Sequence, residues 1–468
     1  MATSPFSVVA SHVWLGGTFR PARVGIRDGV IAEVVRLSSV YDPCGPPGDI
    51  GGAVYRLPDD TVLLPGLVDT HVHVNEPGRT EWEGFRSATL AAAAGGVTTI
   101  VDMPLNSIPP TTNADALRIK RKAAGRNAYV DIGFWGGAVP GNLGTLADLH
   151  REGVFGFKCF LSPSGVDEFP HLDAAQLVHA MAEVARLDSL MIVHAEDPDL
   201  LADEGSIGPA YGEFLRSRPA SSERSAIDTV IDAVRRTGCR THILHLSDGS
   251  ALPAIRAAKA AGLPLTVETC PHYLSLVAEE IPDGASEYKC CPPIREAGNR
   301  DLLWRGVLDG TIDAIVTDHS PSTVAMKRAG DGDFGLAWGG ISGLQVGLSV
   351  VWTEASKRGV PLSALLPLFT TGPARVAGLA GAGEIAVGRP AHLTVFGPDR
   401  PMPVNAHELQ HRNKISAYDG RVLAGRFLRT WLHGESIFDA KAGGAGQAPS
   451  LRRSPKGRLL NARAAGRA

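Results

Sequence analysis

Short apolar runs rich in β-branched residues alternate with Ala/Leu-rich stretches from about residue 62 to about residue 380. Strands are predicted over 62–68, 97–101, 154–160, 190–193, 241–246, 265–268 and 314–316, and helices over 85–94, 174–187, 227–236 and 251–261. Repeated strand–helix units indicate a parallel sheet. Roughly 300 such residues favour an α/β fold of the (β/α)8 TIM-like barrel type over a doubly wound sheet. No Gly-x-Gly-x-x-Gly follows the first strand, which weakens a dinucleotide-binding alternative.

The two ends of the chain have a different pattern. Residues 6–35 contain β-prone segments with a hairpin signal at Asp28-Gly29, and strands are predicted again over 392–396 and 426–431. We therefore predict a composite β domain from residues 1–61 and 380–440, and a barrel from residues 62–379. Residues 441–468 are rich in Gly, Ala, Pro and Arg and contain no acidic residue, so a disordered basic tail is expected there.

Composition excludes several classes of function. Of 468 residues, 44% are hydrophobic and 20% are charged, and the formal net charge is −3. This balance gives no reason to expect a nucleic-acid or membrane partner, and no apolar run approaches the ~20 residues that cross a bilayer. The six cysteines are scattered without a Cys-x-x-Cys motif, and Met1–Pro5 does not begin a secretory signal. A reduced, cytoplasmic protein is expected.

Polar residues follow the first predicted barrel strand. His71 and His73 are two residues apart, so in a strand their side chains point to the same face. Two imidazoles on one face suit a shared metal ion. A pair of histidines packed in a core is the alternative for this stretch taken alone.

Other predicted strands carry a polar residue within them or just after them. The candidates are Lys158, His194, His245 and Asp318. His242 and His245 are three apart and face opposite ways in a strand, so only one points into the mouth; we choose His245 because it is closer to the strand end. The carboxyl ends of barrel strands meet at one face, where active sites lie. Together with His71 and His73, these residues predict a metal site, although an ammonium group cannot bind a cation and Lys158 alone indicates an ordinary ion pair.

Several longer motifs carry a resemblance to a known family. They cover residues 71–84, 102–107, 134–137, 156–160, 289–295 and 337–343. From about residue 6 to 435, the chain resembles the cyclic amidohydrolases of the amidohydrolase superfamily, which include hydantoinases/dihydropyrimidinases, dihydroorotases and allantoinases. The resemblance implies a small β-sandwich built from both chain ends, and commonly a homotetramer. It also implies two divalent metal ions, usually zinc, held by His71, His73, Lys158 carboxylated by CO2, His194, His245 and Asp318.

Within this family the resemblance is strongest to allantoinases. Dihydroorotases typically carry an Arg, which binds the substrate carboxylate, where Asn75 stands here. A neutral residue fits the neutral ureido group of allantoin. Asn75 is thus a weak candidate for substrate binding, with a turn residue beside Pro77-Gly78 as the equal alternative. Thr317 stands where relatives often have Ser, a mild departure.

The resemblance implies metal-dependent hydrolysis of the hydantoin ring of allantoin to allantoate, in purine catabolism, with Asp318 as catalytic base and then acid. Two alternatives remain open. One is another cyclic amidohydrolase, a hydantoinase/dihydropyrimidinase or a dihydroorotase, and the other is a non-catalytic scaffold. Sites built from His and carboxylates also accept Co, Mn, Ni or Fe, so the sequence does not fix the metal.

Overall fold

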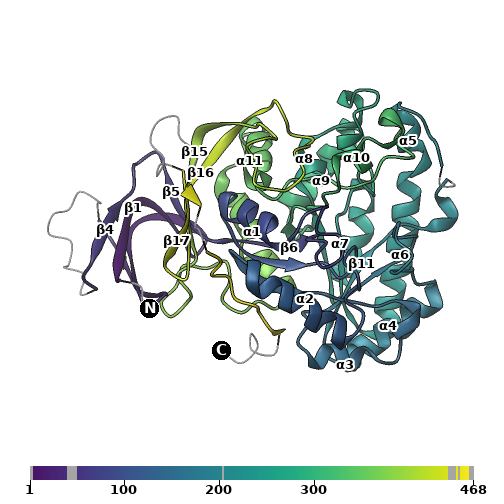
Figure 1. Ribbon diagram of the computed structural model, residues 1–468, viewed down its shortest axis with the longest axis horizontal. Coiled ribbons are helices and arrows are strands. Elements are labelled where there is room, and N and C mark those ends of the chain that lie inside the picture. The colour runs from purple at the N-terminus through teal and green to yellow at the C-terminus, as the bar shows by residue number, and fades with distance from the viewer. Residues whose placement is uncertain (1–3, 39–49, 203–204, 441–449, 452–453, 463–468) are drawn as a thin grey trace.

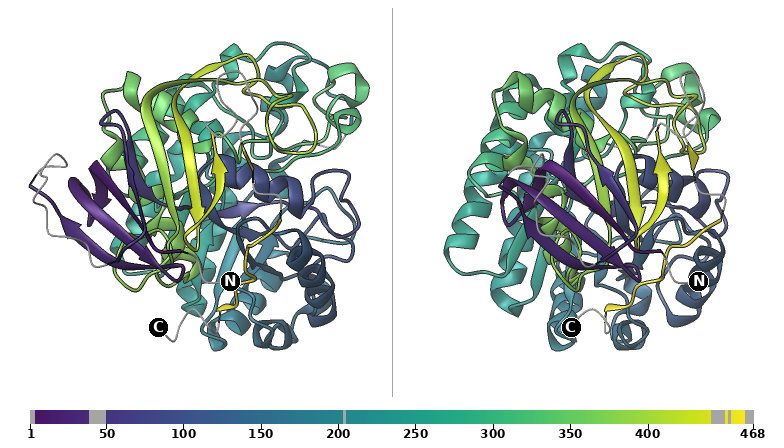
Figure 2. Two further views of the ribbon diagram at one scale, coloured as in Figure 1. Left: turned by 60° about the vertical axis from the view of Figure 1, so that its left-hand side comes forward. Right: turned by 90° about the vertical axis from the view of Figure 1, so that its left-hand side faces the viewer.

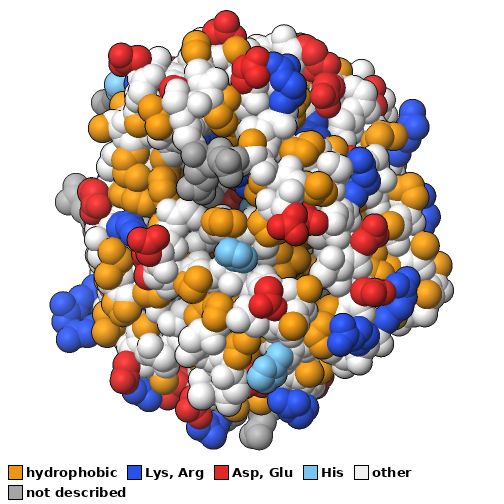
Figure 3. Space-filling view, turned by 90° about the vertical axis from the view of Figure 1, so that its right-hand side faces the viewer, with side chains coloured by type: hydrophobic (Ala, Val, Ile, Leu, Met, Phe, Trp, Pro, Cys, Tyr) orange, Lys and Arg blue, Asp and Glu red, His pale blue; other side chains and the backbone are white. Residues whose placement is uncertain are grey.

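The computed structural model describes residues 4–38, 50–202, 205–440, 450–451 and 454–462. Figure 1 shows helices packed around a central group of strands, with a smaller β domain beside them. The first strands of the chain (purple) and the last strands (yellow) lie in that β domain. On the face turned away from the β domain, acidic and basic side chains are interspersed (Figure 3). Among the described residues, no helix is both long and apolar enough to cross a membrane.

The barrel strands are parallel, as the sequence predicted. In the described part of the chain they are β6 (Leu67–Val72), β7 (Val97–Asp102), β8 (Asp131–Phe134), β10 (Phe157–Phe160), β11 (Leu190–His194), β12 (Arg240–Ile243), β13 (Leu265–Thr269) and β14 (Ala314–Ile315), with short β9 (Gly136–Gly137) beside β10. They pair in the orders β6-β7-β8 and β9-β10-β11-β12-β13-β14. Phe155 N–H donates to Phe134 O at one junction, and a parallel bridge joins Val72 to His319 at the other. The ring is closed, which confirms the barrel.

Helices cover the barrel. They are α1 (Phe85–Ala94), α2 (Ala114–Asn127), α3 (Leu146–Arg151), α4 (Ala174–Arg186), α5 (Tyr211–Ser217), α6 (Ala220–Thr237), α7 (Leu252–Ala260), α8 (Pro271–Ser275), α9 (Ala297–Leu308), α10 (Val324–Lys327), α11 (Gly347–Lys357), α12 (Leu362–Phe369) and α13 (Thr371–Ala377). Helix α4 shows why these segments form. Asp173 and Gln176 cap its first turn reciprocally, and Leu177, Met181 and Val184 recur on the face that is buried.

The β domain is built from both ends of the chain. Its strands are β1 (Phe6–Leu15), β2 (Thr18–Arg27), β3 (Val30–Arg36), β4 (Ala53–Arg56), β5 (Val62–Pro65), β15 (Leu393–Pro403), β16 (Val422–Leu432), β17 (Glu435–Asp439) and β18 (Ser450–Leu451). Strand β5 joins the two halves, because it pairs with β1 on one side and with β15 on the other. Figure 2 shows the purple and yellow-green strands meeting in this domain. Val8, Val24, Leu393 and Trp431 pack in its core, which confirms the composite β-sandwich.

The boundary between the domains differs from the predicted one. The apolar run over 62–68 is not one strand: β5 belongs to the sandwich, and β6 begins the barrel after Gly66. A Cβ atom at Gly66 would lie 2.1 Å from Thr98 Oγ1, so only glycine fits at this crossing. The barrel therefore starts at residue 67 instead of residue 62. The break between β5 and β6 could not be predicted from hydrophobicity, because both strands are buried and the apolar run is continuous across Gly66.

Part of the predicted disordered tail is ordered. Ser450–Leu451 form β18, and residues 457–462 run along the barrel: Gly457 N–H donates to Ala128 O, and Leu460 N–H donates to Ile132 O. For these residues the expectation of a solvated tail was wrong, because backbone hydrogen bonds hold the segment and Leu459, Leu460 and Ala462 pack against the hydrophobic core. Residues 441–449, 452–453 and 463–468 lie outside the described part.

Candidate metal centre

One cavity gathers the six metal-ligand candidates predicted from the sequence. It has a volume of about 450 Å³, and its lining includes His71, His73, Lys158, His194, His245 and Asp318. His71 and Lys158 lie within β6 and β10, His194 ends β11, and His73, His245 and Asp318 follow β6, β12 and β14, so the fold brings all six to the face formed by the carboxyl ends of the strands. The predicted convergence is therefore present in the structure.

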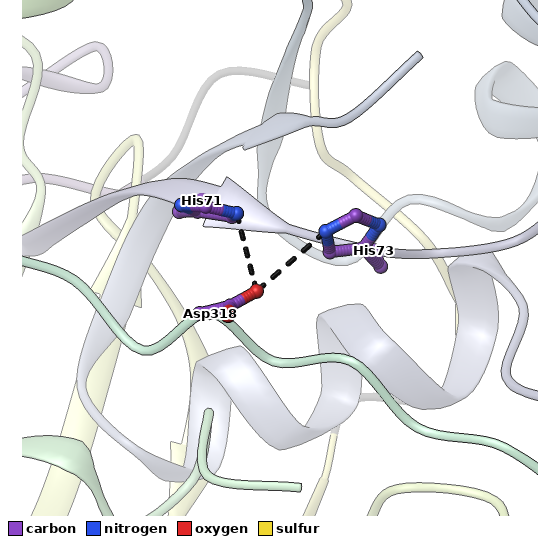
Figure 4. A group of neighbouring side chains, drawn as sticks. All are labelled: His71, His73 and Asp318. Atoms are coloured by element: carbon purple, nitrogen blue, oxygen red, sulfur yellow. Dashed lines mark ion pairs between the residues drawn. The ribbon is translucent and has the colours of Figure 1, made fainter. Parts of the chain in front are cut away.

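His71, His73 and Asp318 form the first half of the site (Figure 4). Asp318 Oδ1 lies 3.1 Å from His71 Nε2 and 3.6 Å from His73 Nε2. Asp318 has a left-handed backbone, with φ 43°, and it accepts a hydrogen bond from Ser320 Oγ at 2.7 Å. The tight turn after β14 thus aims the carboxylate back at the two rings. We call these three residues the carboxyl-end cluster.

His194 and His245 form the second half. His194 Nδ1 lies 2.9 Å from His245 Nε2. His194 is the last residue of β11, whereas β12 ends at Ile243 and His245 lies beyond it with φ 35°. This turn, and not strand alternation, points His245 into the cavity. His242 faces elsewhere and contacts Glu268, so the choice of His245 over His242 agrees with the geometry.

Lys158 lines the same cavity, and among the described residues it forms no ion pair with an acidic side chain. Its side chain is buried, and its Nζ lies 4.8 Å from the centroid of the Phe160 ring. Among the described residues, no hydrogen bond or ion pair to Nζ is found. Burial lowers the pKa of Lys158 to about 8, against the opposing influence of Asp318 and Glu268. The ordinary ion pair that the residue alone indicated is absent from the described contacts.

Two buried carboxylates hold the outer nitrogens of the histidines. Glu268 Oε1 lies 2.5 Å from His71 Nδ1, and its Oε2 lies 2.9 Å from His242 Nε2. Glu196 Oε2 lies 2.8 Å from His194 Nε2 and accepts a hydrogen bond from Arg218 Nη2 at 2.6 Å. Carboxylates in this position fix the orientation and tautomer of a ligand imidazole. Sequence reasoning missed both, although Glu268 stands at the end of a predicted strand and Glu196 follows His194 by two.

The donor set fits divalent metal ions. His245 Nδ1 is buried and makes no hydrogen bond, and His71 Nε2 is buried with the Asp318 carboxylate as its contact at 3.1 Å. Burial disfavours the His71 cation, yet Asp318 and Glu268 outweigh it and raise the pKa of His71 to about 9. The two carboxylates therefore create a place where positive charge is stabilised in a buried cavity. Imidazole nitrogens with carboxylate oxygens are the ligands that zinc and related ions take.

The cavity wall differs from the one proposed from sequence. Asn75 is buried, its Nδ2 donates to Pro321 O at 3.1 Å, and it is not among the lining residues. Its geometry is that of a residue that fixes a turn, so the structure does not bring Asn75 to the substrate cavity. Asn106 does line the cavity, and its Oδ1 has no hydrogen-bond partner. Sequence reasoning missed Asn106, although it lies in the quoted motif over 102–107.

Two lysines bind backbone carbonyls of another part of the cavity wall. This wall includes Gly339 and Gly340. Lys289 Nζ donates to Gly335 O at 3.1 Å and Ala337 O at 2.6 Å. Lys327 Nζ donates to Lys289 O at 3.0 Å, Trp338 O at 2.9 Å and Gly340 O. Backbone carbonyls thus anchor this wall to the side-chain nitrogens of two buried lysines.

Comparison with known proteins agrees with this geometry. A family model described as "Amidohydrolase family" matches residues 62–435. The chain is 53% identical over 443 residues to an allantoinase of Streptomyces avermitilis, covering 94% of this chain and 95% of that protein. It is 41% identical over 455 residues to an allantoinase of Saccharomyces cerevisiae, covering 95% and 97%. The solved L-hydantoinase (dihydropyrimidinase) of Arthrobacter aurescens matches with a TM-score of 0.87 and 26% identity, covering 97% of this chain and 99% of that one.

These similarities extend across both the barrel and the β domain, and the family match includes every cavity residue discussed above. The fold, the histidine and carboxylate set and the sequence similarity agree with one another. The chain belongs to the amidohydrolase family.

Proposed function

We propose that this chain hydrolyses the hydantoin ring of allantoin to give allantoate. The observation that carries the proposal is the convergence of His71, His73, Lys158, His194, His245 and Asp318 on one cavity, in a chain 53% identical to an allantoinase over nearly its full length. Water adds to the ring carbonyl carbon, the ring C–N bond breaks, and the leaving nitrogen takes up a proton. The reaction is a cyclic amide hydrolysis.

Two divalent metal ions, with zinc as the expected pair, would be held by this set. His71, His73 and Asp318 would bind one ion, His194 and His245 the other, and carboxylated Lys158 both. Such ions, when bound, polarise a carbonyl oxygen and lower the pKa of water toward ~7. Glu268 and Glu196 would keep the imidazoles in the orientation that ligation requires.

Lys158 is suited to carboxylation. Because its pKa is lowered to about 8 and it has no acidic partner among the described residues, a substantial fraction of the amine is neutral near pH 7.5. The neutral amine attacks CO2, forms an N–C bond and releases one proton, leaving a carbamate with two oxygen donors. An anion at this position would also balance two cations in a buried cavity.

Asp318 would move the proton during hydrolysis. Burial opposes its charge, but His71, His245 and His73 outweigh that effect and hold the pKa of Asp318 well below its usual range. The carboxylate is therefore ionised and can accept a proton from the attacking water. Ser320 holds it in place at 2.7 Å, so it can then return that proton to the ring nitrogen. The amide oxygens of Asn75 and Asn106 both lack a hydrogen-bond partner, and Asn106 is the one of the two that lines the cavity, so we propose Asn106 as the side-chain amide that contacts the substrate.

A four-substrate assay tests the proposal. Purified protein with added Zn²⁺ is incubated with allantoin, hydantoin, dihydrouracil and dihydroorotate, and ring opening is measured. We expect kcat/KM for allantoin to exceed the others by at least about tenfold, a difference of about 1.4 kcal/mol in transition-state binding. Turnover of dihydrouracil but not allantoin would instead assign a dihydropyrimidinase. No turnover of any ring with full metal content would favour the scaffold alternative.

A homotetramer and a cytoplasmic location are further parts of the proposal. Both are supported by resemblance and composition alone. Light scattering on the eluting protein tests the first, since a tetramer would have four times the 49.2 kDa chain mass. Fractionation of source cells tests the second.

A further inference from the structure

A second histidine–carboxylate cluster lies away from the cavity. Its members are Asp131, His392 and His433, which we call the amino-end cluster. Asp131 is the first residue of β8, so it lies at the amino ends of the barrel strands. His392 immediately precedes β15, and His433 lies in the turn between β16 and β17. The cluster therefore joins the barrel to the sandwich.

The ligand atoms have spacings that suit one ion. His392 Nε2 lies 3.4 Å from His433 Nε2 and 3.7 Å from Asp131 Oδ2, and His433 Nε2 lies 3.0 Å from Asp131 Oδ2. In a tetrahedral site with bonds of 2.0–2.2 Å, neighbouring ligand atoms lie about 3.3–3.6 Å apart. The three observed spacings bracket this range.

The surroundings leave room for a cation. Asp131 Oδ1 accepts a hydrogen bond from Arg458 N–H at 2.8 Å and also lies 3.1 Å from His433 Nε2, and Oδ2 is the oxygen that faces both histidines. Among the described residues, no Lys or Arg forms an ion pair with Asp131. The side chain of Arg458 is the nearby cation, and its influence on His392 is weaker than that of Asp131 or His433. The His392 and His433 side chains are 11% and 13% exposed, so water can occupy a fourth position.

We infer that Asp131, His392 and His433 bind a divalent first-row transition metal ion, with zinc as the probe ion. The rings need one adjustment. His392 Nε2 is almost equally distant from the two nitrogens of His433, at 3.3 and 3.4 Å. Rotation of the His433 ring about its Cβ–Cγ bond turns Nε2 toward the ion. The ion then links β8 of the barrel to the start of β15 and to the turn between β16 and β17, at a place distinct from the cavity.

A hydrogen-bonded chain from His392 through His433 to Asp131 is the alternative, and a Gln substitution separates the two. Gln retains an amide that can donate to Asp131 but is a poor zinc ligand. Wild-type protein, His433→Gln and Asp131→Asn are stripped with a chelator, equilibrated with Zn²⁺, desalted and analysed for metal. His407→Gln, an exposed position in the same domain, is the matched control.

We expect wild type and the control to bind one Zn²⁺ per chain more than either variant, while all four keep their ring-opening activity. The Zn²⁺-dependent rise in Tm should also be larger in wild type, by at least about 2 °C. Equal stoichiometry in all four proteins would overturn the inference and leave a hydrogen-bonded cluster.

A crystallographic measurement does not depend on the variants folding. Crystals of wild-type protein soaked in Zn²⁺ should show an anomalous difference peak bonded to His392 and His433. Peaks confined to the large cavity would overturn the proposed site.

Discussion

The carboxyl-end cluster and the amino-end cluster contain the same chemistry in different settings. Each has two histidines and one aspartate with ligand atoms within 4.8 Å of one another. In the carboxyl-end cluster all three side chains are buried, and Glu268 holds the outer nitrogen of His71. In the amino-end cluster the histidines are partly exposed, and among the described residues no carboxylate other than Asp131 contacts either ring. One cluster lines a cavity of about 450 Å³, and the other does not.

This difference separates two uses of one ligand set. Histidines whose outer nitrogens are fixed, in a cavity that admits a small molecule, are positioned for chemistry. Histidines that join two domains at a partly exposed junction are positioned for stability. Substitutions in the carboxyl-end cluster should therefore change turnover. Substitutions in the amino-end cluster should change metal content and Tm without changing turnover.

The largest expected effect is at Asp318. Asp318→Asn removes the proton acceptor and one ligand, so kcat for allantoin should fall about 10²–10⁴-fold. Asp131→Asn, the matched change in the amino-end cluster, should leave kcat within about twofold. The assay is steady-state ring opening, with circular dichroism to verify folding. Equal losses in the two variants would remove the functional distinction between the clusters.

Lys158 lines the same cavity as the carboxyl-end cluster, whereas the three residues of the amino-end cluster include no lysine. Lys158→Ala should lower the metal content of the cavity and reduce turnover about 10³-fold, since several kcal/mol of transition-state stabilisation are lost. Lys122→Ala, an exposed lysine, is the control. Metal analysis and turnover are measured together, and added bicarbonate should raise the activity of CO2-depleted wild type but not of Lys158→Ala. Full metal occupancy in Lys158→Ala would contradict the bridging role.

The orienting carboxylate should give an intermediate effect. Glu268→Gln keeps the shape of the side chain but weakens its hold on His71, so metal affinity or turnover should fall about 10–100-fold. Glu280→Gln, on an exposed position of the same region, should change neither. Competition with a chelator of known affinity measures the metal affinity. An unchanged affinity and turnover would mean that outer-nitrogen contacts do not distinguish the two clusters.

The smallest effect is expected at Lys327, a buried lysine beside the cavity whose hydrogen-bond partners are backbone carbonyls and not a carboxylate. Burial lowers the pKa of Lys327 to about 7, below the usual 10.5. Between these pH values the unfolded chain binds a proton that the folded chain does not, so stability rises with pH. The rise should approach about 1.4 kcal/mol per pH unit, and Lys327→Met should lack it. Denaturant unfolding at pH 7.5, 8.5 and 9.5 measures the difference, and parallel pH profiles for the two proteins would contradict the assignment.

The sequence pattern predicted the barrel because buried β-branched strands alternate with helical segments, of which α4 is amphipathic and α1 is an Ala-rich helix buried over most of its length. The metal candidates were predictable because each lies in or just after a recognisable strand. The break at Gly66 was not, since it depends on Thr98, which is distant in the sequence. Glu268 was missed for a related reason: its role depends on His71 and His242, which approach it only in the closed barrel. The position of Asn75 outside the cavity lining was not predictable, because a change of residue type between families does not show where a side chain points, and a substrate contact by Asn75 stays a prediction.

The pairing of β5 with both β1 and β15 has a consequence for synthesis on the ribosome. The edge of β5 that receives β15 is complete near residue 65, but its partner begins at residue 393. At 5–20 residues per second, the intervening chain of about 330 residues takes roughly 15–65 s to make. During that interval the nascent sandwich has an open, apolar strand edge, the kind of surface that pairs with other chains. Chaperone binding or slow collapse must therefore keep this edge from pairing with other chains until the last strands are made. Truncation before residue 393 would leave the edge permanently open.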